Sequence, residues 1–476
     1  MLLRNDTPAV SNGVHFTTTS SDADIAAYDV VVVGGGLAGI GAAIGAKQAS
    51  PKSSVLLIES EGCLGGAATH RGVLSFCGLY SVEPEPRRAV GAIWTEIHRR
   101  LVEQRAAAEV PDRIVAYVQN FDPEGLKCVL DDLVESYHID VLLHCTVVGG
   151  TRTANKLTAV EVQERRGRRR IHAKAFVDCS GDGDLAFHGG ASTRYGNHGH
   201  VNMGSLATRF GGLANANPTS ALWRDAIIAA KEADPKLKTI IPRNVGVLIK
   251  MPRTGDISTY MASAQYDATV SASIAAAEQQ GRRQAKVYLD ILRKLPGHEN
   301  MYLVSTGPNF GTRESRHINS RYQLTESDIV ESREFEDTVA VGAWYMEWHD
   351  STKEDWPILF KSPPEGTFNI PLRSLWSEDT CNLFCAGRCM DGDKSASSAF
   401  RVLGTALATG QAAGVAAALR VLEDADPTSA EVRRILLKHG ALLDRHNLIK
   451  AVHVEEPEGR NLSHHEALTG HQQELT

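Results

Sequence analysis

Residues 28–39 read YDVVVVGGGLAG, and this stretch decides the fold class of the chain. The apolar run 28–33 is typical of a parallel strand that is covered on both faces. We expect Gly34 to make a tight turn, Gly36 to let the backbone approach a pyrophosphate, and Gly39 to let the next helix pack on the strand. The stretch therefore predicts a strand, a phosphate-binding turn and a helix over 37–49.

A second strand and an acidic residue follow at the spacing that a dinucleotide site needs. Residues 55–58 are apolar and lead into Glu59, whose carboxylate would accept hydrogen bonds from an adenosine ribose and repel the extra phosphate of NADP. The helix would offer amides at its start, including those of Leu37 and Ala38, to the phosphates. A G-x-G-x-x-G motif alone is weak evidence, but the whole strand–helix–strand unit with its acid predicts a dinucleotide.

The loop that follows distinguishes between the two common dinucleotides. Residues 60–69 read SEGCLGGAAT, a second loop of small residues after the ribose acid. A nicotinamide-binding site has no need of it, whereas a longer cofactor extended past the first strand does; a flexible turn is the alternative interpretation. We therefore expect FAD, and the loop residues expected in its site are Ser60, Gly65, Gly66 and Thr69. His70 would lie close to the isoalloxazine, so a histidyl-flavin bond is an alternative to noncovalent binding.

A second cofactor segment lies near the carboxyl end, where residues 381–419 read CNLFCAGRCMDGDKSASSAFRVLGTALATGQAAGVAAAL. An apolar strand leads into Gly387 and Arg388, then into a polar loop and a long helix rich in Ala and Gly. We expect the amides of Gly404, Thr405 and Ala406 at the pyrimidine edge of the flavin, where negative charge develops on reduction. Small residues at 410–414 would let this helix pack close to the first strand and its phosphate loop.

Together with VDCSGDGDLA at 177–186 and GTRESRHI at 311–318, these motifs resemble the FAD-dependent oxidoreductase family related to fumarate reductase flavoproteins, with a glutathione-reductase-type FAD fold. The resemblance covers about residues 28–420. It implies that Asp184 serves the FAD-binding region, that Arg388 contacts the cofactor near its ribityl chain, and that Arg401 holds an anionic substrate. Gly181 and Val147 complete the expected cofactor site. Relatives carry histidines where this chain has Lys394 and Ser397, so no imidazole is expected from that loop.

The predicted fold class is α/β, with a Rossmann-type FAD-binding domain that is split in the sequence and an inserted α+β substrate domain. The predicted parts are a flexible leader over 1–27, FAD-binding segments over 28–195 and 370–425, the insertion over 196–369, and a C-terminal helix and polar tail over 426–476. Within the insertion we expect a long helix around 267–294 and a capping box at Thr325. The site should lie between the two domains.

Four residues are candidates for the chemistry. A histidine suits proton transfer because it titrates near neutral pH, and His349 is the first choice, with a structural histidine as the alternative. Arg313 and Arg316 would hold a substrate anion beside Arg401, or they form an interdomain salt-bridge set around Glu314.

Composition excludes several classes of function. The formal charge of −7 and the pI near 6.2 argue against binding to nucleic acid or an anionic membrane. No stretch of about 18 apolar residues predicts a membrane span. None of the eight cysteines forms C-x-x-C or a metal-ligand spacing, so we expect no metal, no redox-active pair and a cytoplasmic location.

The predicted function is hydride transfer between a small organic metabolite and FAD. No second G-x-G-x-x-G follows residue 39, so electrons would pass to dioxygen or another acceptor, as in an oxidase or dehydrogenase. The alternatives are a fumarate-reductase-like reductase of an unsaturated acid and a flavin monooxygenase. An RNA-modifying flavoprotein and a non-catalytic flavin-binding scaffold are alternatives from other classes.

Overall fold

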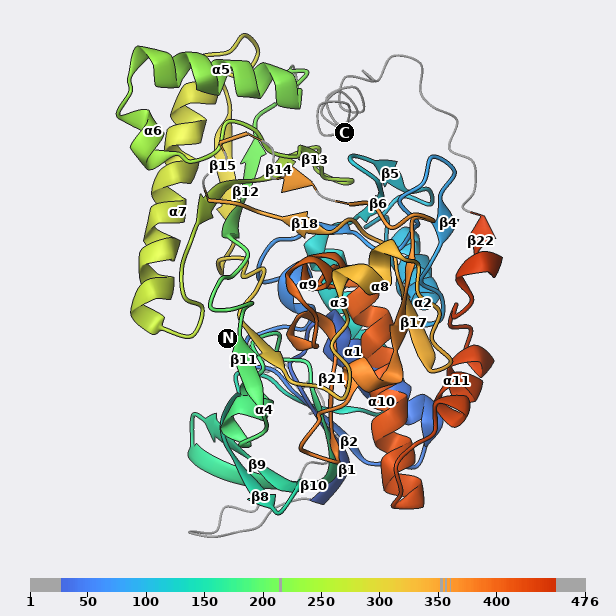
Figure 1. Ribbon diagram of the computed structural model, residues 1–476. Helices are drawn as coiled ribbons and strands as arrows, with labels where there is room; N and C mark the ends of the chain where they lie inside the picture. Colours follow the sequence, from blue (N-terminus) through green and yellow to red (C-terminus); the bar gives the residue numbers. More distant parts are fainter. Residues whose placement is uncertain (1–26, 214–215, 352–353, 356–357, 360, 451–476) are drawn as a thin grey trace, which may run out of the picture.

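The computed structural model describes residues 27–213, 216–351, 354–355, 358–359 and 361–450. The predicted polar tail and all of the predicted leader except Ala27 fall outside these ranges. The described chain forms two halves, each built on a β-sheet with helices packed against it (Figure 1).

The larger half contains a mixed sheet with the order β7-β2-β1-β10-β9-β8, and β21 pairs with β10 off this path. Strands β7, β2, β1, β10 and β21 run parallel, whereas β9 is antiparallel to both β10 and β8. The strands are β1 (Ala27–Val33), β2 (Val55–Ile58), β7 (Asp140–Leu142), β8 (Thr146–Thr153), β9 (Lys156–Glu164), β10 (Gly167–Asp178) and β21 (Leu383–Cys385). The two strands predicted at 28–33 and 55–58 are therefore confirmed, and they are neighbours in the sheet.

Two helices rich in Ala and Gly, α1 (Leu37–Ala49) and α10 (Leu403–Glu423), pack on this sheet and on each other. A Cβ atom at Gly410 would lie 2.0 Å from the carbonyl oxygen of Ala38, and one at Gly414 would lie 1.9 Å from that of Ala42. The small residues of α10 were predicted to let it pack close to the first strand and its phosphate loop. Helix α10 does contact β1, Gly410 lies against Ala38 of that loop, and Gly414 lies against α1. The reason is that glycines on both helices let the two backbones come into contact.

Helix α10 is the one helix of the described residues that is long and apolar enough to cross a membrane by length and composition. However, 78% of its most apolar window is buried inside the protein. Its apolar surface is therefore used in packing against its neighbours.

Further helices of the larger half include α2 (Ile93–Glu103), α3 (Pro123–Ser136), α4 (Asp184–His188), α9 (Lys394–Phe400) and α11 (Ser429–Lys438). Helix α3 begins where its sequence indicates, because the Asp122 carboxylate accepts hydrogen bonds from the amides of Glu124 and Gly125, both at 3.1 Å. Short strands of this half are β3 (Ser75–Phe76), β4 (Arg87–Arg88), β5 (Asp112–Arg113), β6 (Tyr117–Asn120) and β22 (Ile449–Lys450).

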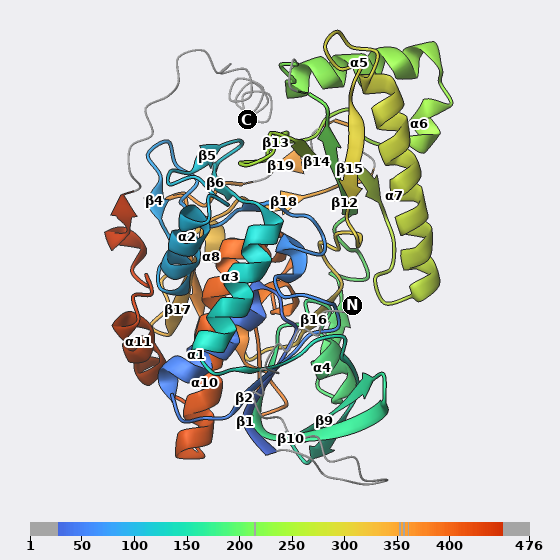
Figure 2. The ribbon, with the colours of Figure 1, turned by 180° about the vertical axis from the view of Figure 1, so that it is seen from behind.

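The smaller half is an antiparallel sheet with the order β13-β14-β12-β15. Its strands are β12 (Gly204–Gly211), β13 (Ile249–Lys250), β14 (Ile257–Ala264) and β15 (Tyr302–Thr306). Helices α5 (Ser220–Ala233), α6 (Leu237–Ile240) and α7 (Ser271–Leu292) lie beside it, as both views show (Figures 1 and 2). A separate apolar core that includes Phe210, Trp223 and Tyr288 joins the helices to the sheet. The long helix predicted around 267–294 is confirmed as α7.

Other strands of segment 196–369 pair with or pack on the larger half. Strand β16 (Arg316–Ile318) pairs with β11 (Thr193–Tyr195), and β17 (Thr338–Gly342) pairs with β20 (Phe368–Pro371) and packs on α10 and α11. Helix α8 (Glu326–Val330) begins with the predicted capping box between Thr325 and Asp328, and β18 (Glu347–Trp348) pairs with β19 (Ile358–Leu359). The fold is thus mixed α/β with a Rossmann-type arrangement, while a separate inserted domain and the domain boundaries stay predictions.

Candidate active site

A cavity of about 400 Å³ is enclosed by residues of both halves. Val33 and Ile58, at the carboxyl ends of β1 and β2, line it on one side, which is where open parallel sheets bind ligands. Ser205 from β12 and Tyr260 from β14 line it on the other side. The cavity is therefore placed where sequence reasoning expected the site, between the sheet of the larger half and that of the smaller half.

The three glycines of the first turn serve different purposes. Gly34 has a φ of +99°, and a Cβ atom there would lie 2.3 Å from the carbonyl oxygen of Cys179; at Gly39 it would lie 1.7 Å from that of Gly34. Gly36 has an ordinary φ of −67°, and its nearest atom would be the Cα of Gly66 at 3.8 Å. Packing therefore requires glycine at 34 and 39, whereas at Gly36 a side chain would only fill the cavity at the start of α1. This opening fits a phosphate group.

The acid after β2 lies in the cavity wall with its loop. Glu59 is 6% exposed, and its carboxylate accepts hydrogen bonds from the Gly35 amide at 2.6 Å and the Ser60 hydroxyl at 3.0 Å. Among the other residues predicted for the cofactor, those that line the cavity are Gly34, Gly36, Leu37, Ala38, Ser60, Gly66, Val147, Gly181, Asp184, Gly387, Arg388 and Ala406.

Gly65 and Thr69 do not line the cavity but hold the second loop in place. The Gly65 amide donates to the carbonyl oxygen of Gly35 at 2.9 Å, and the Thr69 hydroxyl donates to that of Leu64 at 2.8 Å. Their position gives them an indirect role, since they fix the loop against the first turn. His70 does line the cavity, with its Nε2 atom 3.2 Å from the Cys63 sulfur, and the histidyl-flavin alternative stays a prediction.

An ion-paired group forms a further part of the wall. Arg388 donates to Asp182 at 2.9 Å and to the Ser315 hydroxyl at 2.8 Å, and Arg71 lies 3.8 Å from the other oxygen of Asp182. Burial favours a raised pKa for Asp182, but the two guanidinium groups outweigh it and lower that pKa. Asp182 and Arg71 were missed by sequence reasoning, although the SGDGD turn contains Asp182.

The start of α10 differs from its prediction. The Gly404 amide donates to the carbonyl oxygen of Cys77 at 2.9 Å, and the Ala406 amide donates to that of Val402 at 2.9 Å. These two amides are therefore engaged within the protein, and Gly404 and Thr405 do not line the cavity. Leu403, the first helical residue, does line it. The absence of a side chain at Gly404 lets α10 approach Gly78, and the predicted contact of these amides with the flavin stays a prediction that their hydrogen bonds within the protein do not favour.

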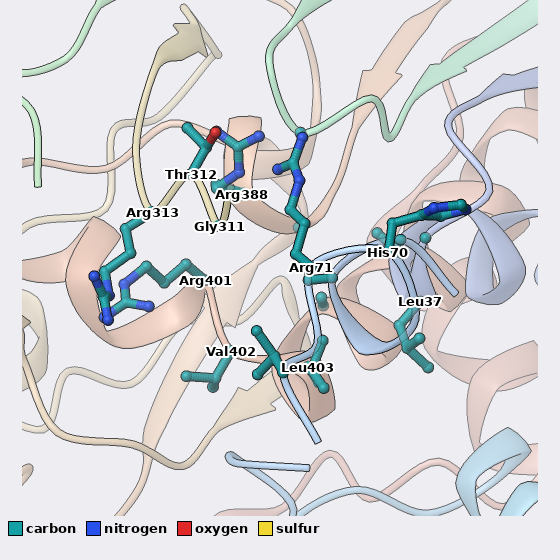
Figure 3. A pocket seen from close by; sticks show the side chains of 18 of the residues that line it. Leu37, His70, Arg71, Gly311, Thr312, Arg313, Arg388, Arg401, Val402 and Leu403 are labelled. Atoms are coloured by element: carbon teal, nitrogen blue, oxygen red, sulfur yellow. The ribbon is translucent and has the colours of Figure 1, made fainter. Parts of the chain in front are cut away.

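At the far end of the cavity lie three of the four candidate catalytic residues: Arg313, Arg401 and His349. The Arg313 and Arg401 side chains lie side by side, with their guanidinium groups pointing the same way (Figure 3). Arg313 donates to the carbonyl oxygen of Met203 and to the Ser205 hydroxyl. Arg401 lies 3.8 Å from a carboxylate oxygen of Glu347, and its Nε atom is buried without a hydrogen-bond partner.

The charges at this end do not balance. Within the described residues Arg313 has no ion-pair partner, whereas Arg401 has Glu347. Burial, and then repulsion from Arg401, lower the pKa of Arg313 to about 9, so it is still protonated at neutral pH. For Glu347, burial acts to raise the pKa, but His349 and Arg401 outweigh it and hold that pKa well below its usual range. Glu347 is the carboxylate within ion-pair distance of the pair, and the charge of Glu314 also acts on Arg401. Two buried guanidinium groups that share one ion-paired carboxylate favour binding of an anion.

His349 is held as a neutral side chain. Its imidazole is 13% exposed, and its Nε2 atom lies 3.0 Å from a carboxylate oxygen of Glu347, which also accepts a hydrogen bond from the Trp344 indole at 3.0 Å. Burial, and then the charge of Arg313, lower the pKa of His349 to about 3. A neutral imidazole that donates from Nε2 to Glu347 has Nδ1 available as an acceptor. Sequence reasoning missed Glu347, which no motif distinguishes.

Arg316 lies outside the cavity lining. Its guanidinium group forms an ion pair with Asp184 at 3.0 Å and lies over the ring of Phe187, 4.1 Å from the ring centre. It follows Arg313 by three residues, but it lies on β16 and is turned toward α4. Its position does not favour the predicted role in holding substrate. Arg316 does form a salt bridge, but with Asp184 and not in the alternative set around Glu314.

Solved structures that superpose on this chain have low sequence identity to it. A geranylgeranyl bacteriochlorophyll reductase-like protein from Thermoplasma acidophilum is 12% identical, with a TM-score of 0.45, and the match covers 87% of this chain and 83% of that chain. The p-nitrophenol 4-monooxygenase from Pseudomonas putida DLL-E4 is 12% identical, with a TM-score of 0.43 and coverage of 87% and 85%. No curated protein matches the chain.

One family model matches most of the chain. A model described as FAD dependent oxidoreductase matches residues 29–438, which includes both predicted cofactor segments and all four candidate catalytic residues. The relation to fumarate reductase flavoproteins stays a prediction. The family match shows that the cofactor is FAD, and the opening at Gly36 and the position of Glu59 in the cavity wall agree with it. The chain belongs to the FAD dependent oxidoreductase family and is a flavoprotein enzyme.

Proposed function

We propose that this enzyme oxidises a small organic anion and passes the electrons to dioxygen or another acceptor, as an oxidase or dehydrogenase. The observation that carries the proposal is the buried pair Arg313 and Arg401, in which Arg313 has no ion-pair partner among the described residues. A buried, uncompensated charge costs several kcal/mol, and an anionic substrate would relieve that cost.

The cofactor's place follows from the residues at the other end of the cavity. Gly36 and the start of α1 would receive the pyrophosphate, Glu59 would bind the adenosine ribose, and Arg388 would lie near the ribityl chain. When bound, FAD supplies the acceptor for two electrons from the substrate. The arginine pair lines the same cavity, so a substrate anion held there would share that cavity with the cofactor.

His349 is the residue that would take the substrate proton. In the free enzyme it is a weak base, because burial and the charge of Arg313 disfavour its protonated form. Binding of an anion beside Arg313 would neutralise that repulsion and raise the pKa of His349. The imidazole would thus become an effective base only when a substrate anion is present, while Glu347 holds the ring in one orientation.

A reductase of unsaturated acids is the second candidate, because the same arginine pair would hold its substrate. The two differ in the direction of electron flow. In the oxidative reaction the organic anion reduces the flavin, whereas in the reductive reaction an external donor does so and the unsaturated acid reoxidises it. A flavin monooxygenase would need an external donor together with dioxygen.

The test is anaerobic reduction of the purified holoenzyme, followed by its absorbance spectrum. A panel of 2-hydroxy acids and amino acids is added first, then NADH, and then fumarate or another unsaturated acid. Bleaching by a member of the panel, and not by NADH, is the expected result, and Arg313→Met should abolish it while retaining FAD. Bleaching only by an external donor, with recovery on addition of an unsaturated acid, would establish the reductase instead.

A further inference from the structure

An apolar surface lies next to the arginine pair. It consists of Ile114, Val118, Trp344, Tyr345 and Val402, which belong to one hydrophobic cluster and all line the cavity. We call these five residues the apolar wall. Val118 is 2% exposed, Trp344 is 6% exposed and Val402 is 8% exposed, and the partly buried Ile114 and Tyr345 pack against them.

The wall is joined to the charged end by direct contacts. Val402 follows Arg401 in the sequence, and the Trp344 indole donates to Glu347 at 3.0 Å, which in turn lies 3.8 Å from Arg401. A molecule whose anionic group lies at the arginine pair therefore has the apolar wall beside it. The wall adds no charge, and burial raises the pKa of the neighbouring Cys77 thiol, which keeps that group neutral as well.

The charges around the arginine pair specify how many negative charges the ligand carries. Arg401 is compensated by Glu347, His349 is neutral, and Arg243, which also lines the cavity, has Asp350 as a nearby opposite charge. Arg313 has no ion-pair partner among the described residues, although the charge of Glu347 also acts on it and that of Glu314 acts on Arg401. A single negative charge would balance Arg313, whereas a second would lie near Glu347 and be repelled.

We propose that the substrate is a monoanion with a hydrophobic body, such as a monocarboxylate that carries an aromatic or branched aliphatic group. Its carboxylate would lie at Arg313 and Arg401, and its apolar part would lie on the apolar wall. This inference rests on the proposed function, since it takes the arginine pair as the anion site. It excludes dicarboxylates of the fumarate type as the preferred ligand.

The test compares four probes by titration of the FAD-loaded enzyme, with the change in flavin absorbance as the readout: acetate, succinate, 3-phenylpropionate and the neutral 3-phenylpropanamide. Burial of the phenyl group predicts binding of 3-phenylpropionate on the order of 50-fold tighter than acetate. The neutral amide should bind at least about tenfold more weakly than the acid, because it leaves Arg313 uncompensated.

Other binding results would contradict separate parts of this inference. Equal binding of acetate and 3-phenylpropionate would overturn the role of the wall, and tightest binding of succinate would overturn the single negative charge. Either result would leave the anion site itself intact. No binding of any carboxylate would overturn the proposed function together with this inference.

A substitution in the apolar wall provides an independent test. Ile114→Ala should weaken 3-phenylpropionate by about fivefold and leave acetate unchanged, since only apolar contact area is lost. The matched control is Val110→Ala, because Val110 precedes β5, is 41% exposed and does not line the cavity. If Ile114→Ala lowers FAD affinity and leaves both acids unchanged, the wall contacts the cofactor and the inference is wrong.

Discussion

The substitution Gly36→Val separates cofactor binding from folding. The backbone at Gly36 has φ −67° and ψ 179°, which valine adopts without strain, and a Cβ atom there would have only the Cα of Gly66, at 3.8 Å, within 4 Å. The stability of the cofactor-free protein should therefore be unchanged or higher by about 0.4–1 kcal/mol, because the unfolded chain loses freedom. The added carbons would instead occupy the cavity where the pyrophosphate is expected.

The magnitude follows from the cost of overfilling a packed site. Such overpacking costs about 1–3 kcal/mol, which corresponds to FAD affinity lower by roughly 5- to 150-fold. Calorimetric titration of cofactor-free protein with FAD measures the affinity, and thermal unfolding without FAD measures the stability. Gly39→Ala is the contrast, since its Cβ atom would lie 1.7 Å from the Gly34 carbonyl oxygen and should destabilise the protein itself. A Gly36→Val protein that binds FAD as tightly as the wild type would refute the phosphate-loop assignment.

Three further predictions concern the substrate end and the helix pair. Arg401→Ala should keep FAD but lower kcat/KM by about 30-fold or more, since an anion contact worth about 2 kcal/mol or more is lost. The control is Arg373→Ala, at an exposed position. Unchanged turnover of the native substrate by Arg401→Ala would show that Arg401 is not part of the site. The pKa of His349 is lowered by burial, so its contribution to stability is complete above pH 6.5 and decreases as the pH falls toward 3, because the unfolded state binds the proton more readily in that range. Urea unfolding should therefore show a smaller loss of stability between pH 7.5 and 5 for His349→Gln than for the wild type, and equal losses would contradict the lowered pKa. Gly414→Val should destabilise the protein by about 1–3 kcal/mol in urea unfolding, because its side chain meets the α1 backbone. The control is Leu422→Ala, at an exposed position of α10, which should change stability by less than about 0.5 kcal/mol. Equal effects of the two substitutions would contradict the contact between α10 and α1.

The parts of the site that could be predicted from the sequence are those built from neighbouring residues. The turn at 34–39, the helix α1 and the acid Glu59 belong to one continuous strand–helix–strand unit. Their spacing alone predicts a dinucleotide-binding site. The starts of α3 and α8 were likewise predictable, since a capping side chain bonds to amides two or three residues away. Local hydrogen bonds and helix periodicity depend only on the spacing of nearby residues, so the sequence alone predicts them.

The substrate end depended on tertiary structure. Arg313 and Arg401 are distant in the sequence, and only the tertiary fold brings them into one cavity with Glu347 and His349. Arg313 and Arg316 are near neighbours in one motif, yet one lines the cavity and the other pairs with Asp184. The amide of Gly404 was predicted to bind the cofactor, but a loop from elsewhere in the chain engages it. These outcomes depend on contacts between remote segments, because the direction of a side chain and the partner of an amide are set by what packs against them.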